Sequence, residues 1–193
     1  MATCNKKITD DMLFDCSASG KAGVDSGFAV IINSEDLDLT GTSVSASTIS
    51  DLILNSGTTG YKLEFYKQLI NANGSYSPNA EAVDGFIHTV NLRMSTPSAE
   101  SANRATEIKN GRFIVIIETT YKGVNNGDAF RVLGFENGLE LSEMQTSTNE
   151  NASNITFSLT TREGNYEQYI HHIFNETNYA TSKAAFDSLF ANP

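Results

Sequence analysis

The stretch 96–120, TPSAESANRATEIKNGRFIVIIETT, constrains the fold most, because it joins a helix signal directly to the most apolar strand signal of the chain. Thr96 is a residue type that caps helices, and Pro97 suits the first helical position. Gly111 is typical of the position just after a helix end. The pattern therefore predicts a helix over residues 97–110.

Two patterns inside this stretch predict how the helix and the following strand pack. Glu100 and Arg104 are four residues apart, which favours an ion pair along the helix. Small apolar residues recur at every third position and would allow close packing: Ala99, Ala102, Ala105 and Ile108. Phe113 to Ile117 is continuously apolar and mostly β-branched, which is typical of a strand covered on both faces. We expect the helix to cover this strand.

The composition favours one domain built from many short strands. The chain has 193 residues, enough to bury a core, and only 39% of them are hydrophobic. Abundant Ser, Thr, Asn and Gly are typical of strands joined by polar turns. The net charge of −10 argues against wrapping nucleic acid, because phosphate contacts need clustered Lys and Arg. These features exclude a nucleic-acid-binding protein of the basic type.

Residues 1–22 read as a polar N-terminal arm with a few apolar side chains that could dock on another surface: Ile8, Met12, Leu13 and Phe14. The lysines at its start are followed by no apolar run, so we expect no signal peptide, and no stretch is long enough to span a bilayer. Cys4 and Cys16 could pair, but two free thiols in a reducing cytoplasm are the favoured interpretation.

The first half of the chain shows three further strand signals. Residues 27–33 form the first, and residues 43–55 favour a strand, although a short helix also fits their apolar spacing. Residues 61–70 and 86–95 alternate well and are expected to pair with each other. The polar stretch 71–85 between them is predicted to be a long hairpin loop, and loops of that length are usually functional or disordered.

The second half predicts a closing hairpin and helical ends. Asn137-Gly138 stands between the apolar runs 130–135 and 139–141, which is the strongest short hairpin signal in the sequence. A polar loop over 145–154 then leads to a strand over 155–161. Apolar residues at 166, 169, 170, 173 and 174 have helical spacing, but their aromatic and β-branched content leaves a strand open. Residues 182–190 are predicted to be a short helix.

A search for chemical motifs identifies no catalytic constellation. Asp36, Asp38 and Thr40 resemble the start of a calcium-binding loop, but its twelfth position is Ser47 where a bidentate glutamate is needed. Adjacent His171 and His172 point in different directions on any regular element, and a structural role is favoured for His88. Phosphate-cradling, dinucleotide and nucleophile-elbow motifs are absent from the sequence. We therefore expect a non-enzymatic protein with no cofactor and no metal site.

Several local strings resemble structural proteins of tailed bacteriophages, especially tail tube proteins of phages that infect Bacteroides-like bacteria. They are the Cys4 to Cys16 arm with FDC, then VIINSEDLDL, FIHTVNLRM, NGRFIVIIE and FRVLGFENGLEL. The resemblance covers most of residues 24–160. It implies the tube fold shared with contractile injection systems, which is mainly β (α+β): a β-sandwich or open barrel flanked by one central helix, with an N-terminal arm, a long hairpin loop and one or two short C-terminal helices.

The same resemblance implies a domain division and a role. Residues 1–22 would be the N-terminal arm, 23–163 the tube-like β domain and 164–193 a C-terminal extension packing on it. The chain would assemble into hexameric rings that stack into the virion tail tube, with other tail proteins as partners, no membrane, and DNA passing through without specific binding. An acidic lumen would keep DNA from adhering.

The implied inter-subunit contacts lie on strand edges near 27–33 and 86–95, on the loop over 71–85 and on the arm. The residues are Phe28, Val30, Ile32, Asn73, Tyr76, Pro78, Phe86, His88, Met12 and Phe14. Two alternatives stay open: another ring-forming tail or neck component, and an adhesin module that binds glycans or surfaces through its polar loops.

Overall fold

The computed structural model describes residues 23–65, 70–79, 81–123 and 125–191, together with Ile8 and Met12. Its described strands form one hydrogen-bonded system, accompanied by two α-helices, which confirms the predicted mainly-β fold. The order along the sheet is β2 (Ser43–Ser45), β3 (Thr48–Asp51), β11 (His172–Phe174), β8 (Phe130–Leu133), β7 (Phe113–Thr119), β9 (Leu139–Thr146), β10 (Ile155–Thr161), β6 (Gly85–Met94) and β5 (Asn71–Ser77). Strand β1 (Val24–Asn33) pairs with β7 and with β4 (Tyr61–Glu64).

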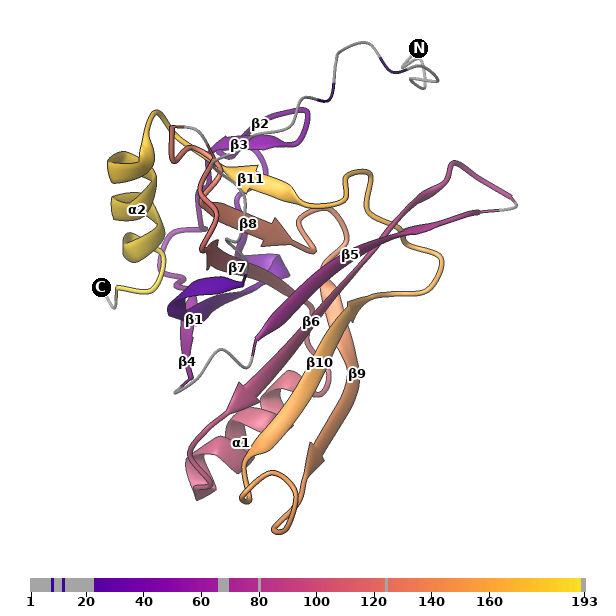
Figure 1. Cartoon of the computed structure of the whole chain (residues 1–193), viewed down its shortest axis with the longest axis vertical. Coiled ribbons are helices and arrows are strands. Elements are labelled where there is room, and N and C mark those ends of the chain that lie inside the picture. Colours follow the sequence, from indigo (N-terminus) through magenta and orange to yellow (C-terminus); the bar gives the residue numbers. More distant parts are fainter. Residues whose placement is uncertain are drawn as a thin grey trace.

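The sheet folds into two layers that meet at β7. Strand β7 pairs along its length with β1 and β8, whereas its pairing with β9 is limited to Phe113 and Leu139. Strands β9, β10, β6 and β5 therefore turn away and form the second layer, with helix α1 (Ala99–Ile108) beside it and α2 (Tyr179–Ser188) on the opposite side of the molecule (Figure 1). The result is a sandwich-like arrangement.

Alternation along β1 and β7 places their side chains in two separate cores. Ala29, Val115 and Ile117 face a core shared with β6 and β10, including Val90, Leu92, Phe157 and Leu159. Their neighbours face a second core beneath α2, which includes Val30, Ile32, Ile114, Ile116, Phe130, Val132, Phe174 and Phe186. Every residue of β7 is buried, so the prediction of a strand covered on both faces is confirmed.

Helix α1 forms where the sequence predicts it, but it begins two residues later. The N-cap is Ser98 rather than Thr96, because the Ser98 hydroxyl accepts a hydrogen bond from the Ser101 backbone N–H and Pro97 stays outside the helix. Arg104 forms its ion pair with Glu107 and not with Glu100. Of the small-residue stripe, Ala105 and Ile108 pack on the first core.

The predicted long loop over residues 71–85 is wrong. Residues 71–77 are strand β5, which pairs in unbroken register with β6 from Asn71 opposite Asn91 to Ser77 opposite Gly85. The expected pairing of 61–70 with 86–95 is wrong as well, since β4 pairs with β1. Strand β5 was missed because most of its side chains are exposed, so it needs no apolar alternation.

The predicted closing hairpin is also wrong. Strands β8 and β9 flank the turn at Asn137, yet they do not pair with each other; β9 pairs with β10 in the second layer. The turn therefore carries the chain between layers. Strand β9 runs on to Thr146, which shortens the predicted loop over 145–154, and the strand over 155–161 is confirmed.

The C-terminal part is integral to the domain, not an extension packed on it. Strand β11 lies between β8 and β3 and pairs in parallel with β3. The helix expected over 165–175 does not form, and the strand alternative holds for residues 172–174. Strands rather than a helix form within 43–55, and the predicted terminal helix is confirmed as α2, with Phe186 and Leu189 buried.

Helix α2 begins with a capping box at Asn178. The Asn178 side chain accepts hydrogen bonds from the backbone N–H groups of Ala180 and Thr181, and the Thr181 hydroxyl accepts one from the Asn178 backbone N–H. Asn178→Ala is expected to lower the free energy of unfolding by about 1 kcal/mol, because these amides lose their acceptor. Asn178→Asp keeps the acceptor and serves as the control in urea denaturation; equal losses in both variants would contradict the capping role.

Candidate functional site

The most prominent feature of the surface is a two-stranded hairpin arm, residues 71–91, made of β5, a turn and most of β6. It extends beyond the rest of the molecule in Figure 1, at the upper right. On its inner side, β6 pairs with β10 and, through Phe86, with Glu167. On its outer side, β5 pairs with no further strand of the described chain, so a row of backbone N–H and C=O groups is open there.

The tip of the hairpin arm is held by side-chain hydrogen bonds. The Tyr76 hydroxyl donates to Asp84 at 2.6 Å, and the other Asp84 oxygen accepts from the Asn79 backbone N–H at 2.8 Å. The hydrogen bond from Tyr76 lowers the pKa of Asp84, and Asp84 in turn raises the pKa of Tyr76. Tyr76 and Val83 remain 61% and 70% exposed. The described part of the tip therefore combines two exposed apolar side chains with hydrogen bonds from Tyr76 and Asn79 to Asp84.

The segment 166–170 clamps the hairpin arm from its middle, where Gly74 pairs with His88, to its tip end, where Gly85 pairs with Ser77. A Cβ atom at Gly74 would collide with the Ile170 carbonyl oxygen, and one at Gly85 would collide with the Tyr166 side chain. Phe86 and Glu167 exchange two backbone hydrogen bonds of 2.8 and 2.9 Å. Only glycines allow so close an approach at these two positions, so the segment lies against both strands of the arm.

A buried polar group beneath this clamp consists of His88, Glu136, Glu167 and His172; we call it the root centre. His88 is fully buried, and its Nδ1 accepts the Gly134 backbone N–H at 3.0 Å. Its Nε2 lies 2.9 Å from the Tyr169 carbonyl oxygen, so it must carry the proton. His88 is therefore a neutral imidazole with both nitrogens satisfied, and burial lowers its pKa.

Glu136 and Glu167 hold each other's segments in the root centre. The buried Glu167 carboxylate accepts the backbone N–H groups of Glu136 at 3.0 Å and Asn137 at 2.9 Å. Glu136 in return accepts the backbone N–H of Gln168. Burial raises the pKa of both carboxyl groups. Together they fasten the turn 134–138 to the segment 166–170.

His172 completes the root centre on the side of β11. It is 1% exposed, and its ring lies 5.0 Å from Phe135 and 5.1 Å from Tyr169. Its Nδ1 is buried and has no hydrogen-bond partner among the described residues. Burial lowers its pKa to about 4, with smaller contributions from His88 and His171. The ring is therefore neutral at neutral pH.

A second buried charge cluster joins α2 to β7. Glu118 is 3% exposed, and one of its oxygens accepts from Lys122 Nζ and from the Tyr179 hydroxyl, each at 2.6 Å. Lys122 also contacts Asp25 at 2.9 Å. Burial alone would lower the pKa of Lys122, but its hydrogen bonds with these carboxylates and with Tyr179 outweigh burial and raise that pKa. This cluster fixes the helix to the sheet.

The structure brings some of the predicted contact residues together and buries others. Asn73, Tyr76, Pro78 and Phe86 all belong to the hairpin arm. Met12 is 84% exposed, and Phe14 lies outside the described residues, as does most of the 1–22 arm. Phe28 is half-buried against Phe186 and Phe190.

Three of the predicted contacts need correction. Val30, Ile32 and His88 are fully buried within the protomer, so their side chains cannot contact another copy. The edges assumed near 27–33 and 86–95 are also occupied, because β1 pairs with β4 and β7, and β6 pairs with β5 and β10. Apolar alternation identified these strands correctly but could not distinguish interior strands from edge strands.

The calcium-like segment forms an ordinary turn. Asp38 accepts hydrogen bonds from the backbone N–H groups of Thr40 and Gly41, and the Thr40 hydroxyl lowers its pKa most. Asp36 binds the Asn33 side chain instead. Within the described residues, no group of three or more His, Cys, Asp or Glu side chains is arranged to hold a metal ion.

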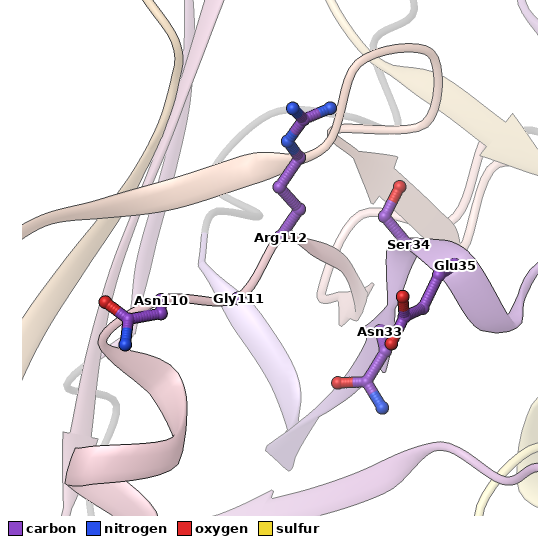
Figure 2. Close-up of a pocket in the computed structure, with 6 residues that line it drawn as sticks. All are labelled: Asn33, Ser34, Glu35, Asn110, Gly111 and Arg112. Atoms are coloured by element: carbon purple, nitrogen blue, oxygen red, sulfur yellow. The ribbon is translucent and has the colours of Figure 1, made fainter.

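An open cleft of about 410 Å³ lies between the end of α1 and the turn after β1. Figure 2 shows that the side chains of Arg112, Ser34, Glu35 and Asn110 point in several directions rather than toward one point in it. Arg112 is already bound to Glu140 at 3.1 Å. The cleft therefore lacks the convergent polar groups typical of ligand sites.

Sequence reasoning missed the root centre and the Glu118 cluster, because their members are far apart in the chain and belong to no motif.

No described helix is long and apolar enough to cross a membrane. Comparison with family models, curated proteins and solved structures finds no match to this chain.

Proposed function

We propose that this chain is a structural subunit of a bacteriophage virion, which assembles with copies of itself into rings that stack into the tail tube. The observation that carries the proposal is the hairpin arm, with its open outer edge and the exposed Tyr76 and Val83 side chains near its tip. An open strand edge recruits a strand of another chain through backbone hydrogen bonds. Exposed aromatic side chains such as Tyr76 are common anchors of an interface.

A contact of the arm with a different surface of the next copy is heterologous, and such contacts close into rings when the rotation between copies permits. The sandwich-like body and the flanking helix α1 agree with the fold implied by the tail-tube resemblance. The net charge of −10 suits a channel that DNA crosses without adhering. Six copies per ring, other tail proteins as neighbours and a place in the virion tail belong to the same proposal.

The proposal is tested by changing the arm tip without touching the core. Tyr76→Ser combined with Val83→Ser is expected to raise the concentration needed for assembly by about thirtyfold, since interface anchors contribute about 2 kcal/mol or more. Leu39→Ser, which alters a side chain that is 71% exposed elsewhere, is the matched control. Point changes are needed because deleting residues 71–85 would remove a strand of the sheet.

Sedimentation velocity and negative-stain microscopy of purified protein provide the measurement. Rings or tubes formed by the wild-type chain and by Leu39→Ser, but weakened in the double variant, support the proposal. Monomers under all concentrations and salts would contradict it. Monomers that bind glycans on an array through Tyr76 would favour the adhesin alternative instead.

A further inference from the structure

All three histidines of the chain lie close together beside the middle of the hairpin arm, although they are far apart in the sequence: His88 is on β6, His172 begins β11 and His171 directly precedes it. Burial lowers the pKa of each of them. None is needed to explain the arm tip or its open edge. Their shared position suggests a role in controlling how the arm is held.

The hydrogen bonds of His88 depend on its being neutral. Its Nδ1 must accept from the Gly134 N–H while its Nε2 donates to the Tyr169 carbonyl oxygen. A protonated imidazole has a hydrogen on both nitrogens, so Nδ1 would place one donor against another across a distance that is now 3.0 Å. His88 cannot turn to avoid this, because its side chain is fully buried beneath the segment 166–170.

We propose that the root centre is an acid-sensitive latch, in which protonation of His88 detaches the turn 134–138 and the segment 166–170 and so frees the hairpin arm. The steps are local. Loss of the Gly134 bond displaces the turn whose amides Glu167 holds, and Glu167 itself is paired with Phe86 in the arm. The clamp on Gly74 and Gly85 loosens with it.

The charged neighbours set the direction of the pH effect. Around His88, the root centre contains Glu136 from the turn, Glu167 from the clamp and His172 from β11. The charges of Arg131 and Asp128 shift the pKa of His171 in opposite directions. His88 and His172 both have a lowered pKa in the fold, so each binds fewer protons there than in the unfolded chain and destabilises the fold as pH falls below 6.5. For His172, whose pKa is about 4, this loss extends down to that pH.

The two carboxyl groups act in the opposite direction. Their pKa values are raised in the fold, so protonation relieves the burial of charge and adds stability as pH falls. The latch therefore opens through His88 and His172, against partial compensation by Glu136 and Glu167. The free energy of unfolding sums these opposing contributions, so a local measurement is needed to separate them.

The test follows His88 and its neighbours by NMR in dilute, unassembled protein from pH 7.5 to 4.5. The His88 ring is expected to be the Nε2–H tautomer at pH 7.5 and to titrate below its ordinary value of 6.5. The Gly134 amide signal should titrate with the same midpoint. Amide exchange, corrected for its intrinsic pH dependence, should accelerate at least about tenfold more at 134–137 and 167–169 than in β7.

His88→Asn is the informative variant, because its side-chain oxygen can replace Nδ1 as an acceptor but cannot titrate in this range. If the variant folds, its Gly134 amide should not respond to pH. If the variant does not fold, the wild-type measurement still tests the latch. A His88 ring that titrates without moving the Gly134 signal, or without faster exchange in these segments, would overturn the latch.

Only the link to assembly rests on the proposed function, so it is measured separately. Sedimentation at pH 7.5 and at pH 5 is expected to show weaker assembly at the lower pH for the wild-type chain. Absence of assembly at both pH values, with a working latch by NMR, would reject the proposed function and leave the latch intact. Equal assembly at pH 7.5 and pH 5, with an open latch at pH 5, would show that assembly through the arm does not depend on the latch.

Discussion

Glu118→Ala is expected to lower the free energy of unfolding by about 3 kcal/mol, because it breaks a buried charge cluster from one side. The Lys122 ammonium would lose its 2.6 Å partner, and the Tyr179 hydroxyl would lose its acceptor. Lys122 keeps Asp25, which has a half-exposed side chain and compensates only in part. The loss should appear as a lower midpoint in urea denaturation with an unchanged slope.

The matched control is Glu107→Ala. Glu107 is paired with Arg104 on the surface of α1, where both side chains are largely exposed. Exposed pairs of this kind contribute about 0.5 kcal/mol. Similar losses for Glu118→Ala and Glu107→Ala would mean that water reaches the Glu118 cluster and that it does not fix α2 to the sheet.

Phe186→Ala is expected to lower the free energy of unfolding by about 3–5 kcal/mol, through lost burial and the cavity left behind. The Phe186 ring is fully buried in the second core, 4.8 Å from Phe130 and 5.6 Å from Phe28 between ring centroids. Calorimetry or urea denaturation measures the effect. Leu39→Ala is the control, since that side chain is 71% exposed and its loss should change stability by less than about 0.5 kcal/mol.

Denaturation of Phe186→Ala also tests whether the C-terminal part unfolds together with the rest of the domain. A cooperative loss over the whole molecule is expected, because α2 and β11 share the second core with β1, β7 and β8. Separate unfolding of residues 164–191, with the remaining strands unaffected, would instead restore the view of an extension packed on a finished domain.

Local sequence patterns predicted the elements of this fold better than their partners. The helix near 97–110, the buried strand after it and the strands near 86–95 and 155–161 all follow from periodicity within a few residues. Pairing depends on contacts between distant segments. The Asn137-Gly138 turn therefore suggested a hairpin, whereas Glu167, thirty residues later, holds that turn in a different connection.

The hairpin arm and the root centre show where sequence reasoning ends. The length and polarity of residues 71–85 predict a loop that is functional or disordered, whereas residues 71–77 form strand β5. This strand has no apolar alternation in its sequence, because solvent reaches most of its side chains. His88 was expected to be structural, and it is buried and satisfied. Its Gly134 and Tyr169 partners are backbone groups, which any residue could provide, so no motif could have identified them.

The position of β11 has a consequence for how the chain matures. This strand is inserted between β8 and β3, so each of those strands lacks one of its two neighbours until residues 172–174 have been synthesised. An incomplete chain on the ribosome would therefore expose two pairing edges inside its sheet, and misassembly with neighbouring chains begins at such edges. Chains stalled before residue 172 are expected to recruit chaperones, and full-length chains tethered to the ribosome by an added flexible C-terminal linker are not, which selective pull-down of arrested ribosomes can measure.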